Sequence, residues 1–202
     1  MPRHCDSRER LLKAASDLMW RGSYNATSVD QICEACGIKK GSFYHHFTSK
    51  EELTLEALEQ KWAGFKAMLD TTFSPLHPPL ERFQRFLAAD REFQQSTCKD
   101  CGFVCGCPMF SLGSEIGTLE PAIREKVSEI LGRLEKYFES AIREAHALGQ
   151  IEAPDAASLA WQVLTLYEGA VTLARIRNDF QPIETLEAGL FRLLGAKAAA
   201  IA

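Results

Sequence analysis

The segment spanning residues 27–50 constrains the fold of this chain more than any other part of its sequence. Apolar residues recur there every three or four positions, so a short helix is predicted with Thr27 or Ser28 as its N-terminal cap. Gly37 tolerates a positive φ angle and is therefore suited to end that helix in a tight turn. A second short helix is expected to open near Lys39. The segment thus predicts two short helices joined by a turn.

The second short helix has an apolar side and a polar side. Phe43 and Phe47 share the apolar side, and we expect them to pack inward. Two helices joined in this way fit the helix-turn-helix pattern, in which the second helix enters the major groove of DNA. Residues 48–51 predict a capping box for a third helix, whose N-terminal amides suit a phosphate. The expected DNA contacts are Thr27, Ser28, Lys39, Lys40, Gly41, Ser42, Tyr44, His45 and Lys50.

These candidates differ in what they can recognise. Lys40 and Ser42 sit where base edges are reachable, and an amine or a hydroxyl can donate to acceptors on guanine or thymine. Thr27, Ser28 and Lys50 are candidates for phosphate contacts, which add affinity but do not discriminate between sequences. The operator sequence therefore does not follow from these side chains.

The same stretch resembles a known family. The chain follows the pattern of the TetR family of bacterial transcriptional repressors at Thr27-Ser28-Val29, Ile32, Gly37-Ile38, Lys40 to Phe47, and Lys50-Glu51-Glu52-Leu53. It departs from that pattern at Cys33 and Cys36, where the family usually has alanine. The resemblance implies an all-α homodimer with an N-terminal three-helix helix-turn-helix domain. It also implies a C-terminal helical domain for ligand binding and dimerisation, and a phosphate contact for Tyr44.

Charge is divided unevenly along the chain. Residues 1–50 carry eight basic and five acidic residues, whereas residues 51–202 carry fifteen and twenty-two. This asymmetry suits a small head that approaches DNA and a body that does not. We therefore expect a DNA-binding domain over residues 1–50 and a regulatory and dimerisation domain over residues 51–202.

The N-terminal residues carry charges where a signal peptide needs an apolar core. No uninterrupted apolar run approaches the length that spans a membrane. We therefore expect a cytoplasmic protein without membrane contact.

The rest of the sequence shows helical periodicity nearly throughout and no convincing strand. Prolines must interrupt the helices within residues 74–79. Residues 96–107 contain glycines and cysteines without a period, so they are predicted to form a loop or a broken helix. Helices are expected at about residues 11–22, 50–73, 80–95, 108–116, 118–149, 154–178 and 182–194.

The last two expected helices bear on quaternary structure. Apolar residues between positions 159 and 174 spread around most of the helical circumference, so a second buried face is implied. A central helix buried inside its own domain explains the pattern equally well. The TetR resemblance favours a four-helix dimer interface, which would place two recognition helices in adjacent major grooves of a palindromic operator.

The chain has seven cysteines, and four of them, Cys98, Cys101, Cys105 and Cys107, gather in one short stretch. We call residues 98–107 the cysteine segment. Stapling by disulfides is not expected in a reducing compartment, so the cluster indicates metal or redox chemistry. Its spacing, C-x2-C-x3-C-x-C, is not a standard zinc pattern, although C-x2-C alone is common to metal and redox sites.

Three interpretations of the cysteine segment stay open. In the first, a thiol senses an electrophile or oxidant, because Gly106-Cys107 before Pro108 resembles the Gly-Cys motif of NemR-like TetR repressors. In the second, three or four of these thiolates bind a soft ion such as zinc, copper(I), arsenite or mercury. In the third, Gly106-Cys107 is a family packing element and Cys107 is a small buried residue.

The remaining cysteines and aromatics have simpler interpretations. Cys33 and Cys36 lie on the first short helix and are expected to be core residues, and Cys5 to be exposed and incidental. Aromatic residues of the body could line a hydrophobic inducer pocket, but at these spacings they are more often ordinary core. A thiol oxidoreductase is the rival class of function. Its C-x2-C motif normally follows a strand, so we expect no enzyme, no catalytic residues and no cofactor.

Overall fold

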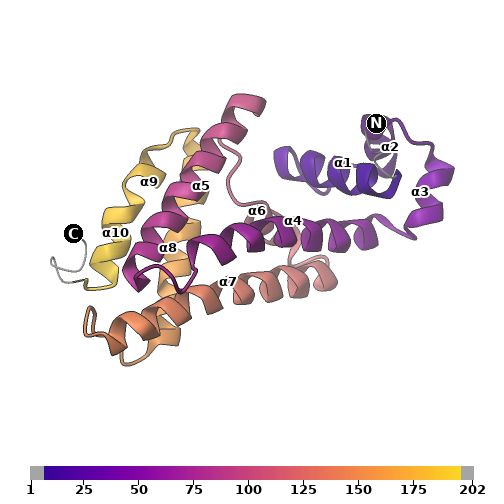
Figure 1. The fold of residues 1–202 in the computed structure, drawn as a ribbon. Helices are drawn as coiled ribbons and strands as arrows, with labels where there is room; N and C mark the ends of the chain where they lie inside the picture. The colour runs from indigo at the N-terminus through magenta and orange to yellow at the C-terminus, as the bar shows by residue number, and fades with distance from the viewer. Residues whose placement is uncertain (1–6, 197–202) are drawn as a thin grey trace. The chain divides into compact units, whose positions relative to one another are not determined.

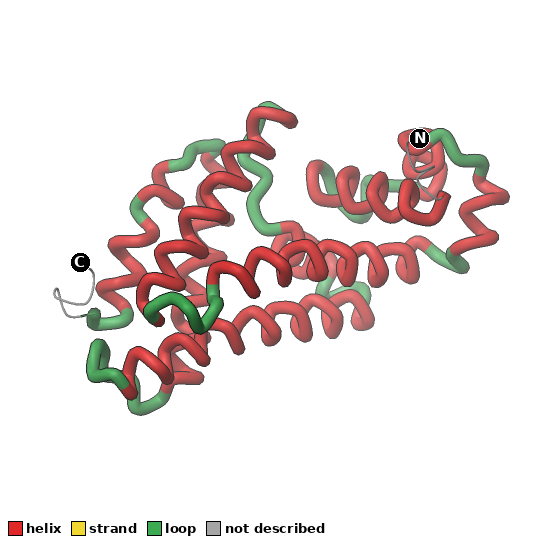
Figure 2. Tube along the Cα trace, in the orientation of Figure 1, coloured by secondary structure: helices red, strands yellow, loops and turns green. Residues whose placement is uncertain are grey.

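The structure of the chain is a computed structural model that describes residues 7–196. Within this part of the chain every regular element is a helix, as Figures 1 and 2 show. The predicted all-α fold is therefore confirmed, while Cys5 lies outside the described residues. The helices are α1 (Ser7–Arg21), α2 (Val29–Cys36), α3 (Lys40–His46), α4 (Lys50–Thr72), α5 (Pro79–Cys101), α6 (Pro108–Ile116), α7 (Pro121–Ala147), α8 (Ala156–Arg177), α9 (Gln181–Glu184) and α10 (Leu186–Leu193).

These helices form two compact units. Among the described residues, the N-terminal unit holds 7–64 and 108–130, and the C-terminal unit holds 65–107 and 131–196. Helix α6 and the start of α7 therefore pack with the N-terminal helices, although they follow the cysteine segment in the sequence. The functional division at residue 50 stays a prediction, because these two units are defined by packing alone.

The first three helices surround a small apolar core. Leu11 and Ala15 of α1, Ile32 of α2 and Phe43 of α3 are completely buried, and Phe47 is 1% exposed. The three-to-four spacing of these residues places them on one face of each helix. The expected inward position of Phe43 and Phe47 is confirmed.

Helix α2 begins and ends where the sequence predicts. The Ser28 side chain accepts a hydrogen bond from the backbone N–H of Gln31, and the Gln31 side chain accepts one from the backbone of Ser28. This is a complete capping box. Gly37 ends the helix with φ of 64°, a conformation that costs glycine little.

The capping at the start of α4 is shifted by one residue from the prediction. The partner is Glu52 and not Glu51, because the backbone N–H and the hydroxyl of Thr48 both donate to the Glu52 carboxylate at 2.6 Å. The N–H of Glu52 in turn donates to Ser49 Oγ at 3.0 Å. Thr48 and Ser49 are therefore both bound to Glu52, and these contacts stabilise the start of α4.

Helix α5 continues through half of the stretch that the sequence assigned to a loop or broken helix. It ends only at Cys101, so residues 102–107 alone are non-helical, and the prediction for residues 96–101 is wrong where it assumed a loop. Gly102 stops the helix with φ of 82°. The helical period was hidden because two polar residues, Gln94 and Thr97, occupy buried positions.

Aromatic side chains fill the core of the C-terminal unit. The ring centroids of Phe73 and Phe83 lie 5.4 Å apart, those of Phe83 and Phe138 5.7 Å, and those of Phe86 and Tyr167 5.1 Å. These are typical separations for tilted and edge-to-face pairs. Phe73 directly follows α4, and the other rings come from α5, α7 and α8, so one aromatic cluster packs the end of α4 against these three helices.

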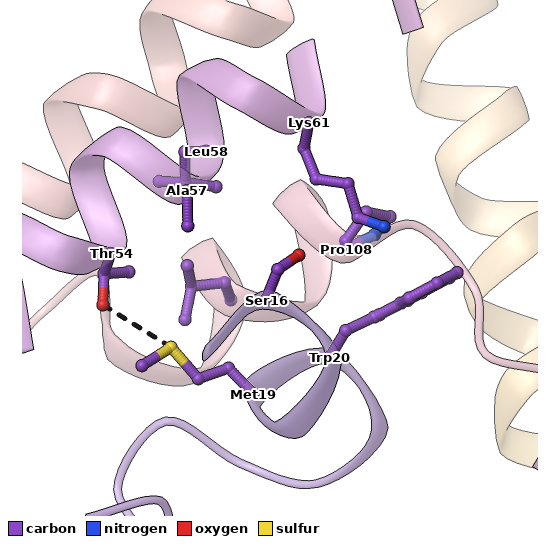
Figure 3. A pocket seen from close by; sticks show the side chains of 9 residues that line it. Ser16, Met19, Trp20, Thr54, Ala57, Leu58, Lys61 and Pro108 are labelled. Atoms are coloured by element: carbon purple, nitrogen blue, oxygen red, sulfur yellow. Dashed lines mark hydrogen bonds between the residues drawn. The ribbon is translucent and has the colours of Figure 1, made fainter. Parts of the chain in front are cut away.

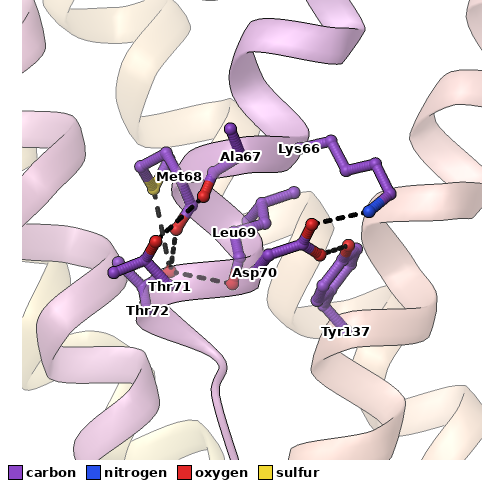
Figure 4. Close-up of polar contacts among 8 residues, drawn as sticks. All are labelled: Lys66, Ala67, Met68, Leu69, Asp70, Thr71, Thr72 and Tyr137. Carbon is purple, nitrogen blue, oxygen red and sulfur yellow. Dashed lines mark hydrogen bonds and ion pairs between the residues drawn. The ribbon is translucent and has the colours of Figure 1, made fainter.

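A polar contact joins α4 to α7 in the same unit, as Figure 4 shows. The Tyr137 hydroxyl donates to Asp70 Oδ1 at 2.5 Å, and Lys66 Nζ lies 2.6 Å from Asp70 Oδ2. Hydrogen bonds from Lys66 and Tyr137 lower the pKa of the Asp70 carboxyl. The Asp70 carboxylate therefore stays ionised and binds both neighbours.

The C-terminal helices follow the prediction with one interruption. Helix α8 agrees closely with the predicted helix 154–178, whereas the predicted helix 182–194 is divided into α9 and α10. Thr185 lies between them with φ of −89° and ψ of −8°. The ψ angle is far from the α-helical value of about −42°, so the regular helix is interrupted there.

Candidate nucleic-acid interface and effector site

Helix α3 presents the largest group of the predicted DNA contacts on one exposed surface. Lys39, Lys40, Gly41, Tyr44 and His45 are all exposed, and Tyr44 leaves 54% of its surface in solvent. Ser42 is half-buried. The buried Phe43 ring packs against the Tyr44 ring in an edge-to-face arrangement, with 5.1 Å between their centroids. We call Lys39–His45 the α3 surface.

Lys40 on the α3 surface forms an ion pair with an acidic residue of α2. Its Nζ lies 2.8 Å from Asp30 Oδ1, and both side chains are exposed. The hydrogen bond and charge of Asp30 raise the pKa of Lys40. The ammonium group therefore stays charged, and Asp30 occupies part of its capacity to donate hydrogen bonds.

Two predicted phosphate contacts are instead engaged inside the N-terminal unit. Thr27 is 6% exposed, and its hydroxyl donates to the carbonyl of Ser23 at 2.7 Å. Lys50 Nζ donates to the carbonyls of Tyr24 and Thr27 at 3.0 and 3.1 Å, and lies 3.8 Å from the centre of the Tyr24 ring. Burial lowers the pKa of Lys50. Both side chains hold the α1–α2 loop, while Ser28 is exposed as the cap of α2.

Glu115 of α6 binds the same loop from the other side, a contact that sequence reasoning missed. Its carboxylate accepts hydrogen bonds from Ser23 Oγ at 2.6 Å and from the backbone N–H groups of Tyr24 and Asn25 at 3.0 and 3.1 Å. Burial alone would raise the pKa of Glu115, but these hydrogen bonds lower it overall. Helix α6 is therefore attached to the loop that leads into α2.

A small cavity lies between α1, α4 and α6 in the N-terminal unit, as Figure 3 shows. Its volume is about 30 Å³, which is room for one water molecule. The hydroxyl of Thr54 donates to Met19 Sδ at 3.5 Å in its wall, and Lys61 Nζ lies 4.6 Å from the centre of the Trp20 ring. A drug-sized effector needs roughly ten times this volume.

Two of the four clustered cysteines lie in contact. The Sγ atoms of Cys101 and Cys105 are 3.1 Å apart. Cys101 Sγ also lies 2.9 Å from the carbonyl oxygen of Thr97 and 3.1 Å from that of Phe103. Cys105 is completely buried, whereas Cys101 is half-buried at the last turn of α5.

The loop after α5 is anchored to the end of α8 by residues that the sequence did not single out. Arg175 Nη1 donates to the carbonyl of Cys105 at 2.7 Å, and the backbone N–H of Val104 donates to Asn178 Oδ1 at 2.9 Å. Gly106 has φ of 72°, and a Cβ at this position would lie 3.2 Å from the Arg175 side chain. The glycine before Cys107 is therefore required by backbone conformation and by close packing.

Two acidic residues are buried in the core of the C-terminal unit, and sequence reasoning missed both. Asp90 is 5% exposed and Glu168 is 2% exposed. Burial raises the pKa of Asp90 to about 6, against hydrogen bonds from Tyr167 and Gln94 that lower it. Burial also raises the pKa of Glu168 to about 7, against a contact from Cys107 that lowers it. An acidic residue inside the apolar pattern of α8 was the available signal for Glu168.

The other cysteines are distributed differently. Cys98 and Cys107 are half-buried, and Cys107 is placed beside Glu168. Cys33 is buried in α2 with its thiol pKa raised by burial, and Cys36 Sγ lies 3.1 Å from the carbonyl of Ile32. The core position expected for Cys33 is confirmed. Across residues 7–196, no three His, Cys, Asp or Glu side chains form a group that could hold a metal ion.

The chain matches known families and proteins along most of its length. The family described as bacterial regulatory proteins, tetR family, matches residues 11–57, and the tetracyclin repressor-like C-terminal domain matches residues 79–190. The transcriptional regulator AcuR of Cereibacter sphaeroides is 28% identical over 180 residues, which cover 88% of this chain and 80% of AcuR. The transcriptional repressor NemR of Escherichia coli K12 is 25% identical over 197 residues, covering 96% of both chains.

A solved structure shares the fold. The crystal structure of a TetR regulatory protein from Rhodobacter sphaeroides superimposes with a TM-score of 0.83 at 28% identity, over 93% of this chain and 98% of that one. None of the helices described for this chain is long and apolar enough to cross a membrane.

Proposed function

Because the chain belongs to the TetR family of bacterial regulatory proteins, we propose that it is a transcriptional repressor that binds a palindromic operator as a homodimer and is released by an effector. The observation that carries this proposal is the α3 surface on a capped helix-turn-helix. Its lysines, tyrosine and histidine offer donors to phosphates and base edges, and Phe43 fixes the helix from below. The role is regulatory, and we assign no catalytic residues, no cofactor and a cytoplasmic location.

The dimer is supported by one face of α8. Trp161, Leu173 and Ile176 expose 62%, 45% and 73% of their surfaces. At 3.6 residues per turn these three side chains fall within about 120° of the helix circumference. Large apolar side chains that stay exposed on one side of a helix in a single chain suit burial against a second copy of the chain.

The effector is proposed to act at the cysteine segment. The contact between the Cys101 and Cys105 sulfurs supports the interpretation that this segment responds to oxidants or electrophiles, in the manner of a NemR-like Gly-Cys motif. The packing of Gly106 against Arg175 equally supports a structural role for that motif. A soft metal ion and a small hydrophobic inducer remain the alternative effectors.

The path from the cysteine segment to the α3 surface is proposed to run through α6. Helix α6 starts at Pro108, directly after Cys107, and its Glu115 holds the loop before α2. A change in the cysteine segment would thus reposition α6 and the reading helices together. The affinity for DNA falls when two recognition helices no longer match adjacent grooves.

A fluorescence anisotropy titration tests the proposed function. The reduced protein is titrated onto its own upstream DNA, and then again after diamide, after N-ethylmaleimide, and with zinc or arsenite. Tight binding with steep salt dependence is expected for the reduced protein, because phosphate contacts release counterions. Release by the thiol reagents is the expected second result, whereas release only by a stoichiometric metal ion would favour the metal alternative.

Tyr44 provides the control for the interface. Tyr44→Ala is expected to weaken operator binding by about tenfold or more through loss of a phosphate contact, and Tyr44→Phe to lose only the hydroxyl's share. Both variants should keep the oligomeric state and the helical content of the parent protein. Unchanged affinity in Tyr44→Ala would remove Tyr44 from the DNA interface.

A further inference from the structure

The cysteine segment places its four thiols in unequal surroundings. The sulfur atoms of Cys101 and Cys105 lie in contact, 3.1 Å apart. A disulfide bond requires about 2.05 Å between sulfurs, so the two atoms need to approach by roughly 1 Å. Gly102 directly follows Cys101, and Gly106 directly follows Cys105. Both glycines have a positive φ and shape this turn.

The same pair differs in access to solvent. Cys101 is half-buried at the end of α5, and Cys105 is completely buried behind it. A dissolved oxidant therefore meets Cys101 first, and the neighbouring Cys105 thiol is in place to react with the oxidised sulfur. This is the arrangement of an attacked and a resolving cysteine.

We propose that Cys101 and Cys105 form an intramolecular disulfide on exposure to a hydroperoxide, and that this bond is the modification that releases the DNA. Only the claim that this disulfide releases the DNA rests on the proposed function. The claim that the disulfide forms concerns the chemistry of Cys101 and Cys105 alone.

The reaction balances in two steps. The Cys101 sulfur attacks one peroxide oxygen, the O–O bond breaks, and Cys101 sulfenic acid forms with release of an alcohol, or of water from hydrogen peroxide. The Cys105 sulfur then attacks the Cys101 sulfur, the S–O bond breaks, and water leaves with the Cys105 proton. Two thiols are oxidised by two electrons in total, and one peroxide is reduced.

The local consequences follow from contacts that the thiols now make. The Cys101 thiol lies 2.9 Å from the carbonyl of Thr97 in the last turn of α5, and a disulfide removes the hydrogen it could donate there. Cys105 is pulled toward α5, while Arg175 holds its carbonyl at the end of α8. The three residues between the cysteines leave little slack, so the strain passes to residues 106–107 and to the start of α6.

The competing pairs lack this geometry. Cys33 and Cys36 belong to the N-terminal unit, and Cys36 Sγ lies 3.1 Å from the carbonyl of Ile32. Cys107 is close enough to Glu168 to lower the pKa of that carboxyl. Cys98 precedes Cys101 by three residues in the same helix, so it serves as the matched control for reactivity.

Peptide mapping tests the pair without DNA. The full-length reduced protein is treated with hydrogen peroxide, blocked with N-ethylmaleimide, and digested with trypsin and chymotrypsin under non-reducing conditions. Cleavage after Lys99 and Phe103 separates Cys98, Cys101 and the Cys105–Cys107 stretch into three peptides. A disulfide between the second and third peptides is expected, and it should disappear in Cys105→Ala and persist in Cys107→Ser.

Operator binding tests whether the disulfide releases the DNA. Peroxide is expected to weaken the affinity of the parent protein by at least about tenfold and dithiothreitol to restore it, within the usual range of coupling between two sites. Cys101→Ser and Cys105→Ala should bind the operator when reduced and keep that affinity after peroxide. Cys98→Ser should respond like the parent protein.

The two experiments test the Cys101–Cys105 pairing and its effect on operator affinity separately. A bond from Cys101 to Cys98 or Cys107, a bond between two chains, or no bond at all would overturn the assignment of the pair. A Cys101–Cys105 bond that leaves operator affinity unchanged would overturn the regulatory half. Failure of the reduced protein to bind its upstream DNA would defeat the proposed function, whereas the peptide map would still decide the chemistry of the pair.

Discussion

Glu168 shows how a single buried side chain can make stability depend on pH. Its carboxyl is 2% exposed, and within residues 7–196 neither oxygen has a hydrogen-bond partner of ordinary geometry. Burial holds the pKa at about 7, above the ordinary value of 4.5, so the folded chain keeps a proton that the unfolded chain has lost. Asp90 acts in the same direction, since its pKa is raised to about 6.

The sign of the pH effect follows from linkage. Between the unfolded and the folded pKa the native state binds more protons, so stability is greatest at low pH in this window and falls as pH rises through about 7. The difference corresponds to roughly 3 kcal/mol. Glu168→Gln is expected to remove most of this decline, raising the free energy of unfolding at about pH 8 more than at about pH 5.

Urea unfolding of parent and variant at both pH values, at one fixed protein concentration, measures this difference. Glu152→Gln is the control, because Glu152 is an exposed glutamate of the same unit. An equal pH dependence in the parent protein and Glu168→Gln would show that the Glu168 carboxyl is not the buried acid responsible.

At the residue scale, the sequence predicted which side of a helix is buried, but it did not predict the partners of polar side chains. Tyr44 and Phe43 were assigned to opposite sides of one short helix, and periodicity was sufficient for that. Thr27 and Lys50 were assigned to phosphates by residue type. Their partners are carbonyls of the α1–α2 loop, and the path of a loop does not follow from a residue pattern.

Helix α6 is the element whose role depends most on tertiary contacts. The sequence predicted its extent, residues 108–116, because proline opens it and an apolar period follows. It did not predict that α6 packs in the N-terminal unit, where Glu115 receives three hydrogen bonds from Ser23, Tyr24 and Asn25. Such a contact joins positions about ninety residues apart and leaves no local signal.

Removing the Glu115 carboxylate is expected to uncouple α6 from the reading helices. Glu115→Ala should leave the reduced protein with operator affinity within a few-fold of the parent, because the α3 surface is unchanged. The loss of affinity after peroxide should shrink markedly, since α6 no longer holds the loop before α2. Anisotropy titrations before and after oxidation measure both quantities.

The neighbouring Ser114→Ala is the matched control on α6, because Ser114 is exposed on the same turn. It should retain the full response of the parent protein. If Glu115→Ala also retained the full response, the signal would have to reach the DNA-binding helices by a route other than this contact.

At the scale of the whole molecule, the apolar residues of α8 divide between a buried side and an exposed side. Val163, Tyr167 and Val171 are buried in the core of their own unit, whereas Trp161 and Ile176 stay exposed. The sequence indicated more apolar surface than one face requires, and the structure shows which residues make up each face. The sequence could not separate the two faces, because the core and the proposed dimer surface use the same residue types.

A charge on the exposed face is expected to dissociate the proposed dimer. Ile176→Lys would bury an unpaired ammonium against its symmetry mate, and because an isologous interface repeats every contact, the cost is incurred twice. Sedimentation at micromolar concentration should show a monomer. Operator affinity should fall by about a hundredfold or more, because each chain then reads one half-site without the other.

Leu76→Lys supplies the comparison for a charge placed on an exposed apolar residue elsewhere. Leu76 is 89% exposed in the turn between α4 and α5, away from α8 in the sequence, so this variant should remain dimeric and keep its operator affinity. Ile176→Lys should also retain the parent's helical content, since Ile176 is 73% exposed in the single chain. A variant that sediments as a dimer would move the interface away from this face of α8. A monomer with undiminished affinity would instead show that one helix-turn-helix suffices, and pairing of the α3 surfaces would no longer explain release by an effector.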